Sequence, residues 1–212
     1  MNTRRLRLLG ILFSVAATVA CVSNGREVPS QGNAASAHQP TQSLTLEIPD
    51  ARWEPIFYKA LEERNKKIGL SSLRSTVLPD DDLEVRFWYD HFELISGVIM
   101  RRSNGKWSAT FIGQSKDPSL PRQQDLGAPK SGWEAAWKRL TDAGILALPD
   151  GSVNCKAEAL DGISYVVETN VNRKYRTYRY GNPQLAHCDE AKRMLLIENI
   201  LAEEFQIPPP PK

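Results

Sequence analysis

The sequence has 212 residues, of which 41% are hydrophobic and 25% are charged, and its formal net charge at pH 7 is +2. At about 150 residues per domain this length predicts one domain, or two at most, and the composition excludes collagen-like, coiled-coil and wholly disordered proteins. The positive charge comes from Arg4, Arg5 and Arg7 in a segment, residues 1–20, that contains no acid. The rest of the chain is close to neutral, so no overall basic field indicates a nucleic-acid partner.

Residues 1–20 have the pattern of an export signal, in which arginines precede an apolar run over residues 8–20. This run is too short for a permanent membrane anchor, which needs about 20 apolar residues. Residues 21–42 are rich in Ser, Gln, Asn and Ala and offer almost nothing that a core could bury. We therefore predict a signal peptide over 1–20 and a flexible tether over 21–42.

The apolar run ends with Thr18-Val19-Ala20-Cys21. This tetrapeptide resembles the bacterial lipobox, although Thr18 stands where leucine is usual. The resemblance implies that Cys21 is lipidated and becomes the mature N-terminus, and that Val22 after it directs the protein to the outer membrane. The protein would then be anchored to the membrane on its periplasmic side. The alternative is ordinary signal cleavage nearby, which gives a periplasmic or secreted protein.

The chain contains three cysteines, an odd number that needs an explanation in an exported protein. If Cys21 carries lipid, Cys155 and Cys188 remain as a pair for a disulfide in an oxidising compartment. That bridge would close a loop of about 34 residues and stabilise the fold by about 3 to 4 kcal/mol in the chain-entropy account. The alternative is two buried free thiols.

The first half of the chain alternates between strand and helix patterns. On the strand at 83–89 the residues Leu83, Val85, Phe87 and Tyr89 share an apolar face, and the other face is mostly polar. Residues 115–130 read as a long loop. The predicted elements are a strand at 43–48, a helix at 53–67, a strand at 83–89, and strands at 94–101 and 106–112 joined by Asn104-Gly105.

In the second half, a capping-box pattern at Ser131 and Glu134 predicts the start of a helix that ends at Gly144. The last helix is predicted from Asp189, as its N-cap, to Phe205. Three short strands are predicted between these helices, near 153–159, 163–169 and 174–180.

Together these elements predict an α+β fold, with antiparallel hairpins or a meander packed against about three helices. The folded part is a single domain over 43–207, followed by a Pro-rich tail over 208–212. Leu-Pro-Asp follows a Trp-bearing helix twice, at 78–80 and at 148–150. Either the domain contains a duplicated unit of one helix and one hairpin, or common turn chemistry recurs, and we favour the turn chemistry.

The second half carries a spaced set of residues: Trp137, Leu140, Gly144-Ile145-Leu146, Leu148-Pro149-Asp150, Asp161-Gly162, Ser164-Tyr165, Glu168, Tyr175-Arg176, Tyr178, Tyr180-Gly181-Asn182-Pro183, Cys188, Glu190-Ala191 and Phe205. This set resembles a pattern seen in uncharacterised exported bacterial proteins. The resemblance implies export and a fold of this class, and it brings no activity with it.

No motif for catalysis or cofactor binding is present in the sequence. It has no Gly-x-Ser-x-Gly, His-Glu-x-x-His, phosphate-binding loop or Cys-x-x-Cys. Residues 187–190 and 80–84 offer metal-ligand types, but their spacing suits neither zinc nor calcium. We therefore predict no catalytic residue, no metal site and no cofactor, and we lean against an enzyme.

Residues 173–180 are the one concentration of arginine and tyrosine. In a strand, Arg176, Tyr178 and Tyr180 share one face and Arg179 lies on the other. Arginine beside aromatic rings suits carboxylate, phosphate or protein recognition, so these four residues are the candidate binding face. The alternative is that one face of the strand is core and the other is a solvated face.

The combined observations predict a non-catalytic binding module of the bacterial envelope, with an envelope protein or a glycan as partner and with inhibitor or immunity roles as specific variants. Two alternatives stay open. One is an envelope hydrolase whose residues converge only in three dimensions, and the other is a purely structural envelope lipoprotein.

Overall fold

A computed structural model of the protein describes residues 43–91, 94–114, 121–157 and 162–207, which all belong to one compact unit. The helices in these residues are α1 (Trp53–Lys67), α2 (Trp133–Ala143), α3 (Gly151–Asn154) and α4 (Asp189–Phe205), with short 3-10 helices η1 (Leu73–Ser75) and η2 (Pro183–Leu185). The strands are β1 (Thr45–Glu47), β2 (Leu83–His91), β3 (Leu94–Ser103), β4 (Lys106–Gln114), β5 (Pro121–Leu126), β6 (Ser164–Val171) and β7 (Lys174–Gly181).

The strands form one mixed sheet in the order β1-β7-β6-β2-β3-β4-β5. Neighbouring strands are antiparallel, except that β1 pairs with β7 in parallel. At the centre, Phe87 of β2 lies opposite Val98 of β3 and Val167 of β6. The predicted α+β fold is confirmed, and Asn104 and Gly105 turn the β3–β4 hairpin with positive φ angles, as this dipeptide favours.

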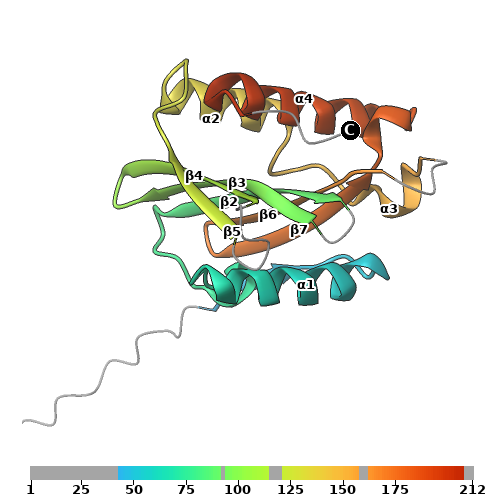
Figure 1. The fold of residues 1–212 in the computed structure, drawn as a ribbon, viewed down its shortest axis with the longest axis horizontal. Coiled ribbons are helices and arrows are strands. Elements are labelled where there is room, and N and C mark those ends of the chain that lie inside the picture. The colour runs from blue at the N-terminus through green and yellow to red at the C-terminus, as the bar shows by residue number, and fades with distance from the viewer. Residues whose placement is uncertain (1–42, 92–93, 115–120, 158–161, 208–212) are drawn as a thin grey trace, which may run out of the picture. The chain divides into compact units, whose positions relative to one another are not determined.

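Helices α2 and α4 cover one face of the sheet (Figure 1). Leu140 of α2 and Ile197 of α4 are buried in a core with Val85, Phe87 and Tyr89 of β2. The apolar face predicted for this strand therefore supplies the floor of the larger core.

Helix α1 covers the opposite face of the sheet, so the sheet is the middle of three layers (Figure 1). Trp53, Phe57 and Leu61 form the stripe of α1 that packs on the sheet, in a cluster with Trp88 and Val166. The central strands are consequently buried on both faces.

The mostly polar face of β2 is buried beneath α1 and the segment that follows it. Arg86 Nε donates to Glu84 Oε1 at 2.6 Å, and the Trp88 indole donates to Glu168 Oε2 at 2.7 Å. Glu84, Arg86 and Glu168 are each only 1% exposed. The pairing explains how the layer tolerates these side chains, because an unpaired charge in such a place costs several kcal/mol.

The strand predicted near 153–159 is wrong for the residues that the structure describes there. Asp150 accepts a hydrogen bond from the Ser152 amide at 3.3 Å and caps the short helix α3 instead. The loop predicted over 115–130 is also partly wrong, because β5 pairs with β4 at the edge of the sheet.

The capping box predicted at Ser131 and Glu134 is not formed. The Ser131 hydroxyl donates to Glu204 Oε1 at 2.8 Å, and the N-cap of α2 is Gly132. Glu134 accepts a hydrogen bond from the Trp107 indole at 2.9 Å. A carboxylate from the last helix has taken the place of the local one.

The N-cap of α4 is Cys188 rather than Asp189, and its Sγ accepts a hydrogen bond from the Ala191 amide at 3.2 Å. The Cys188 sulfur also lies at disulfide-bonding distance from that of Cys155, as the cysteine count predicts, with Cα atoms 5.8 Å apart. The pair joins the end of α3 to the start of α4.

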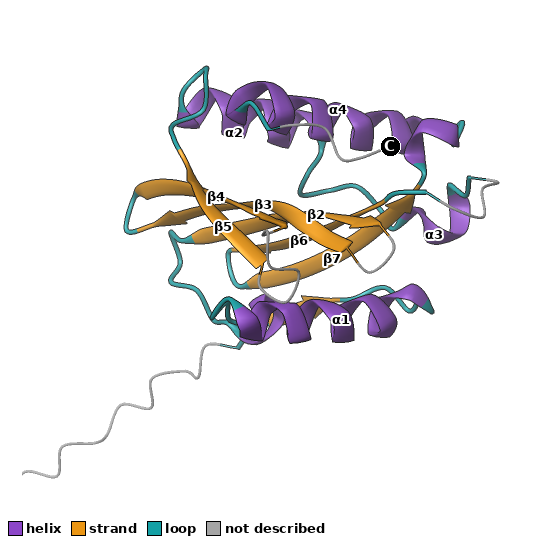
Figure 2. Cartoon of the chain, in the orientation of Figure 1, coloured by secondary structure: helices purple, strands orange, loops and turns teal. Residues whose placement is uncertain are grey.

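The two Trp-bearing helices lie on opposite faces of the sheet, α1 on one and α2 on the other (Figure 2). A twofold axis that exchanged the β2–β3 and β6–β7 hairpins across the antiparallel β2–β6 pair would run perpendicular to the sheet. Such an axis would keep both helices on one face, so their placement favours recurring turn chemistry over a duplicated unit.

No helix within the described ranges is long and apolar enough to cross a bilayer.

Candidate functional site

An open hollow lies where the N-terminal end of α1 meets α3 and strand β7. We call it the Arg179 hollow. It has a volume of about 500 Å³ and is lined by Asp50, Ala51, Arg52, Trp53, Ile56, Ser152, Val153 and Arg179. Its residues come from three separate parts of the chain, which explains why no local sequence pattern marks it.

Arg179 reaches this hollow because side chains alternate along β7. Tyr178 and Tyr180 face α2 and α4, so Arg179 faces the α1 layer. Its Nη2 donates to Ser164 Oγ at 2.6 Å, and its Cζ lies 5.9 Å from the centroid of the Trp53 ring. The Arg179 backbone amide donates to Asp150 Oδ1 at 2.8 Å, which fixes α3 against the strand.

Two buried N–H donors of the Arg179 hollow have no acceptor among the residues that the structure describes. They are Nε of Arg179 and Nε1 of Trp53. Trp53 is only 8% exposed. A buried donor without an acceptor costs about 1 to 3 kcal/mol. Such donors also occur away from the hollow, as at Arg64 Nε and Arg173 Nε, so the two here support a bound acceptor only together with the charge and the walls of the hollow.

The charge of Arg179 is poorly neutralised. No carboxylate within the described residues forms an ion pair with it. Burial raises the pKa of Asp90, two strands away on β2, and the charge of Arg179 only partly opposes that rise. The hollow therefore presents a cation to a ligand.

The walls of the Arg179 hollow are apolar. Ile56 of α1 and Val153 of α3 are each 66% exposed, the largest exposed fractions among the large apolar side chains that the structure describes. Exposed apolar side chains gathered around a polar centre are typical of a binding surface.

An adjoining polar hollow of about 290 Å³ shares Ser152 and Arg179 with the first. It also includes Ser164, Gly181 and Asn182. The Arg179 side chain thus lines an apolar space on one side and a polar space on the other.

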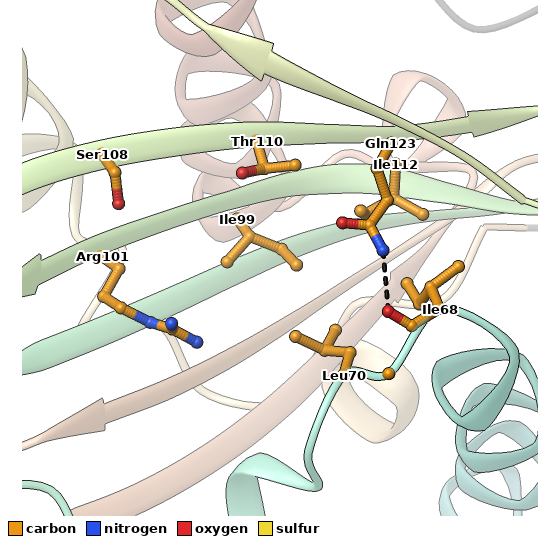
Figure 3. A pocket seen from close by; sticks show the side chains of 9 residues that line it. Ile68, Leu70, Ile99, Arg101, Ser108, Thr110, Ile112 and Gln123 are labelled. Atoms are coloured by element: carbon orange, nitrogen blue, oxygen red, sulfur yellow. Dashed lines mark hydrogen bonds between the residues drawn. The ribbon is translucent and has the colours of Figure 1, made fainter.

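A third hollow, of about 160 Å³, lies between residues 68–70 and the outer strands β3, β4 and β5 (Figure 3). Gln123 closes one side by donating to the Ile68 carbonyl at 2.8 Å. Its cation, Arg101, donates through Nε to Glu84 Oε2 at 2.6 Å. Because that charge is already paired, this hollow is a weaker candidate for binding.

Three of the four residues predicted as a binding face have structural roles instead. The hydroxyls of Tyr178 and Tyr180 donate to the carbonyls of Ile145 and Pro149, both at 2.8 Å. Tyr178 is fully buried and Tyr180 is 1% exposed, and burial raises the pKa of Tyr180 to about 12. Neither ring is available to a partner, because the segment that links α2 to α3 covers both.

Arg176 lies on the same covered face. Its Nη1 donates to the Leu146 carbonyl at 2.9 Å, and its Nη2 donates to the Leu148 carbonyl. Its Nε lies 3.2 Å from a Glu47 carboxylate oxygen. The predicted face at Arg176, Tyr178 and Tyr180 is thus corrected, and of the four residues only Arg179 lines the candidate site.

The sequence interpretation missed Trp53, Ile56 and Val153 as site residues. The helical spacing predicts Trp53 only as part of the buried stripe of α1, which it does begin. Ile56 gives no separate signal, because a position three residues after Trp53 fits the same apolar stripe in a helix, and only the structure shows it exposed. Val153 gives no signal, since the sequence predicts a strand near 153–159.

The Arg179 hollow has a single acid, Asp50, among its lining residues, so it does not contain a pair of carboxylates. No group of three or more potential metal ligands occurs within the described ranges. Cys21 lies outside these residues, and its lipidation stays a prediction.

No protein-family model matches the sequence, and no curated protein matches it either.

Proposed function

We propose that the protein is an envelope lipoprotein that holds a non-catalytic binding domain on the periplasmic side of the outer membrane. The signal pattern over 1–20, Cys21 and the polar tether over 21–42 support the anchor. The Arg179 hollow supports the binding role, with an envelope protein as the favoured partner.

One observation carries this proposal. The Arg179 hollow combines an unneutralised arginine, two buried donors without acceptors in the described residues, and two exposed apolar walls. A fold without a ligand gains nothing from unpaired buried donors, whereas a partner that supplies acceptors would recover their hydrogen-bond energy.

The test is capture of a partner by the anchored protein in its own envelope. The chain, with a C-terminal affinity tag, is cross-linked in cells, solubilised in detergent and purified, and captured proteins are quantified by mass spectrometry. Arg179→Gln and Val153→Glu should each reduce a specific captured partner at least tenfold. The matched control is Leu196→Glu, which changes a side chain that is 48% exposed on α4, outside the hollow.

A partner captured equally by all three variants would refute the hollow as the binding site. Melting temperatures of the three variants should agree within a few degrees, because the substituted apolar positions are exposed and Arg179 makes no ion pair in the described residues.

A further inference from the structure

We infer that the Arg179 hollow binds the C-terminal carboxylate of a peptide chain whose last residue is apolar. This inference rests on the proposed function and names the ligand chemistry of the same site. It follows from three features of the hollow: its donors, its position at a helix end, and its apolar walls.

The donors select an anion with two acceptor oxygens. Arg179 Nε and Trp53 Nε1 are both N–H groups that lack an acceptor in the described residues, and both belong to side chains that line the hollow. Arginine binds carboxylates through parallel N–H···O contacts, and hydrogen bonds to a charged acceptor are about twice as strong as neutral ones. Both N–H atoms have almost no exposed surface, so a carboxylate in the hollow would contact the Arg179 guanidinium first and would reach them only if the arginine side chain moved.

The N-terminal end of α1 adds to the same preference. Arg52 is its N-cap and makes no side-chain capping bond, and Arg52 and Trp53 both line the hollow. The first turn of a helix carries a partial positive charge, which favours an anion there.

The apolar walls of the hollow favour a ligand that has an apolar group next to its carboxylate. Ile56 and Val153 project from α1 and α3 on the rim and are each 66% exposed. A phosphate or sulfate group would make no use of them. The last residue of a peptide offers a carboxylate and an apolar side chain on one Cα, and Asp50 on the rim can accept a hydrogen bond from a peptide amide.

The inference is tested with a defined probe, N-acetyl-alanyl-leucine, and with its C-terminal amide as the matched control. The mature full chain, labelled with ¹⁵N and purified in detergent, is titrated while the Trp53 indole and Arg179 Nε–H signals are followed by NMR. A Trp53→Phe spectrum assigns the indole signal. We expect the acid to shift both signals and the amide to bind about tenfold or more weakly.

Variants separate the contributions of Arg179 and Asp50 to binding. Arg179→Gln should lower the affinity for the acid about tenfold or more. Arg179→Lys should not restore that affinity, because an ammonium lacks the planar fork of the guanidinium. Asp50→Asn should raise the affinity for the acid about two- to fivefold, because it removes a nearby like charge. Arg122→Gln, at an exposed arginine on β5, should leave the affinity unchanged.

Equal binding of acid and amide would overturn the carboxylate assignment. No binding of either probe, with partner capture still dependent on Arg179, would overturn the peptide terminus as ligand and leave the proposed function standing. Partner capture independent of Arg179, Val153 and the probe would overturn both. Ile56→Ala keeps the test informative if the arginine variants misfold. Because Ile56 is exposed, this variant should bind the acid about fivefold more weakly and keep an unchanged melting temperature.

Discussion

The Arg179 guanidinium lies over the indole of Trp53, with Cζ 5.9 Å from the ring centroid. One residue begins the first helix and the other lies near the end of the last strand. Both side chains keep a buried N–H without an acceptor in the residues that the structure describes. The contact therefore positions two donors at one hollow rather than satisfying them.

Replacing Tyr178 by Phe should destabilise the domain. Its hydroxyl donates to the Ile145 carbonyl at 2.8 Å in a fully buried position, and the substitution leaves that carbonyl unpaired. We expect the free energy of unfolding to fall by about 1 to 3 kcal/mol, measured by urea denaturation. Leu196→Ala, at an exposed position on α4, should change it by less than about 0.5 kcal/mol. An unchanged stability of Tyr178→Phe would contradict the structural role assigned to this tyrosine.

Glu204 holds the end of α4 to the start of α2. It accepts hydrogen bonds from the Ser131 amide and hydroxyl, both at 2.8 Å, and it pairs with Arg139. Glu204→Gln should lower the free energy of unfolding by about 1 to 3 kcal/mol at pH 7. The control is Glu203→Gln, because Glu203 is 63% exposed and also pairs with Arg139, and exposed pairs contribute at most about 1 kcal/mol.

The effect of Glu204→Gln should depend on pH. Burial tends to raise the pKa of Glu204, but the hydrogen bonds from Ser131 and the pairing with Arg139 together hold it below its ordinary value. A carboxylate with a lowered pKa in the folded state stabilises the fold above its unfolded pKa, about 4.3, and loses that contribution as the pH falls through the folded pKa. The difference between wild type and Glu204→Gln should therefore be constant from pH 8 to about 5 and shrink below about 4. A difference that grows on acidification would contradict this account.

The Cys155–Cys188 pair should stabilise the domain when oxidised. In the chain-entropy account a loop of this length is worth about 3 to 4 kcal/mol. Non-reducing peptide mapping of protein from the periplasm should find the two cysteines linked, and Cys155→Ser with Cys188→Ser should lower stability by about that amount. Reductant should destabilise the wild type and leave the double variant unchanged. Two free thiols in the purified protein would refute the bridge.

Mass spectrometry of the membrane fraction should find an acylated N-terminal Cys21. Cys21→Ala should abolish the acylation and move the domain out of the detergent-rich phase on phase separation. The Val22→Asp variant tests the sorting signal, because it should remain acylated while leaving the outer membrane. A mature chain that begins elsewhere, with Cys21 unmodified, would refute the anchor.

Sequence patterns correctly predicted the elements whose structure depends on neighbouring residues. The alternation of Val85, Phe87 and Tyr89 placed β2 and its apolar face, and Asn104-Gly105 placed the hairpin. The same alternation could not show that Glu84 and Arg86 are buried, because their ion pair and the contact of Arg86 with the Ser71 carbonyl are tertiary features.

Competition from distant residues explains the wrong local interpretations. Ser131 bonds Glu204 from the last helix instead of Glu134 in its own, and Asp150 caps α3 where strand residues were expected. In the candidate site, strand alternation correctly separated Arg179 from Tyr178. No sequence pattern could show which face was covered, because the sheet has helices on both sides.

The most direct test of the binding role is site-specific photo-cross-linking in living cells. A photoreactive phenylalanine analogue is placed at Val153 in the Arg179 hollow and, as control, at Leu196 on α4, both of which are exposed apolar positions. We predict a discrete adduct from position 153, its loss when Arg179→Gln is added, and no adduct from position 196. An adduct at 153 that persists with Arg179→Gln, or adducts only from 196, would contradict the account.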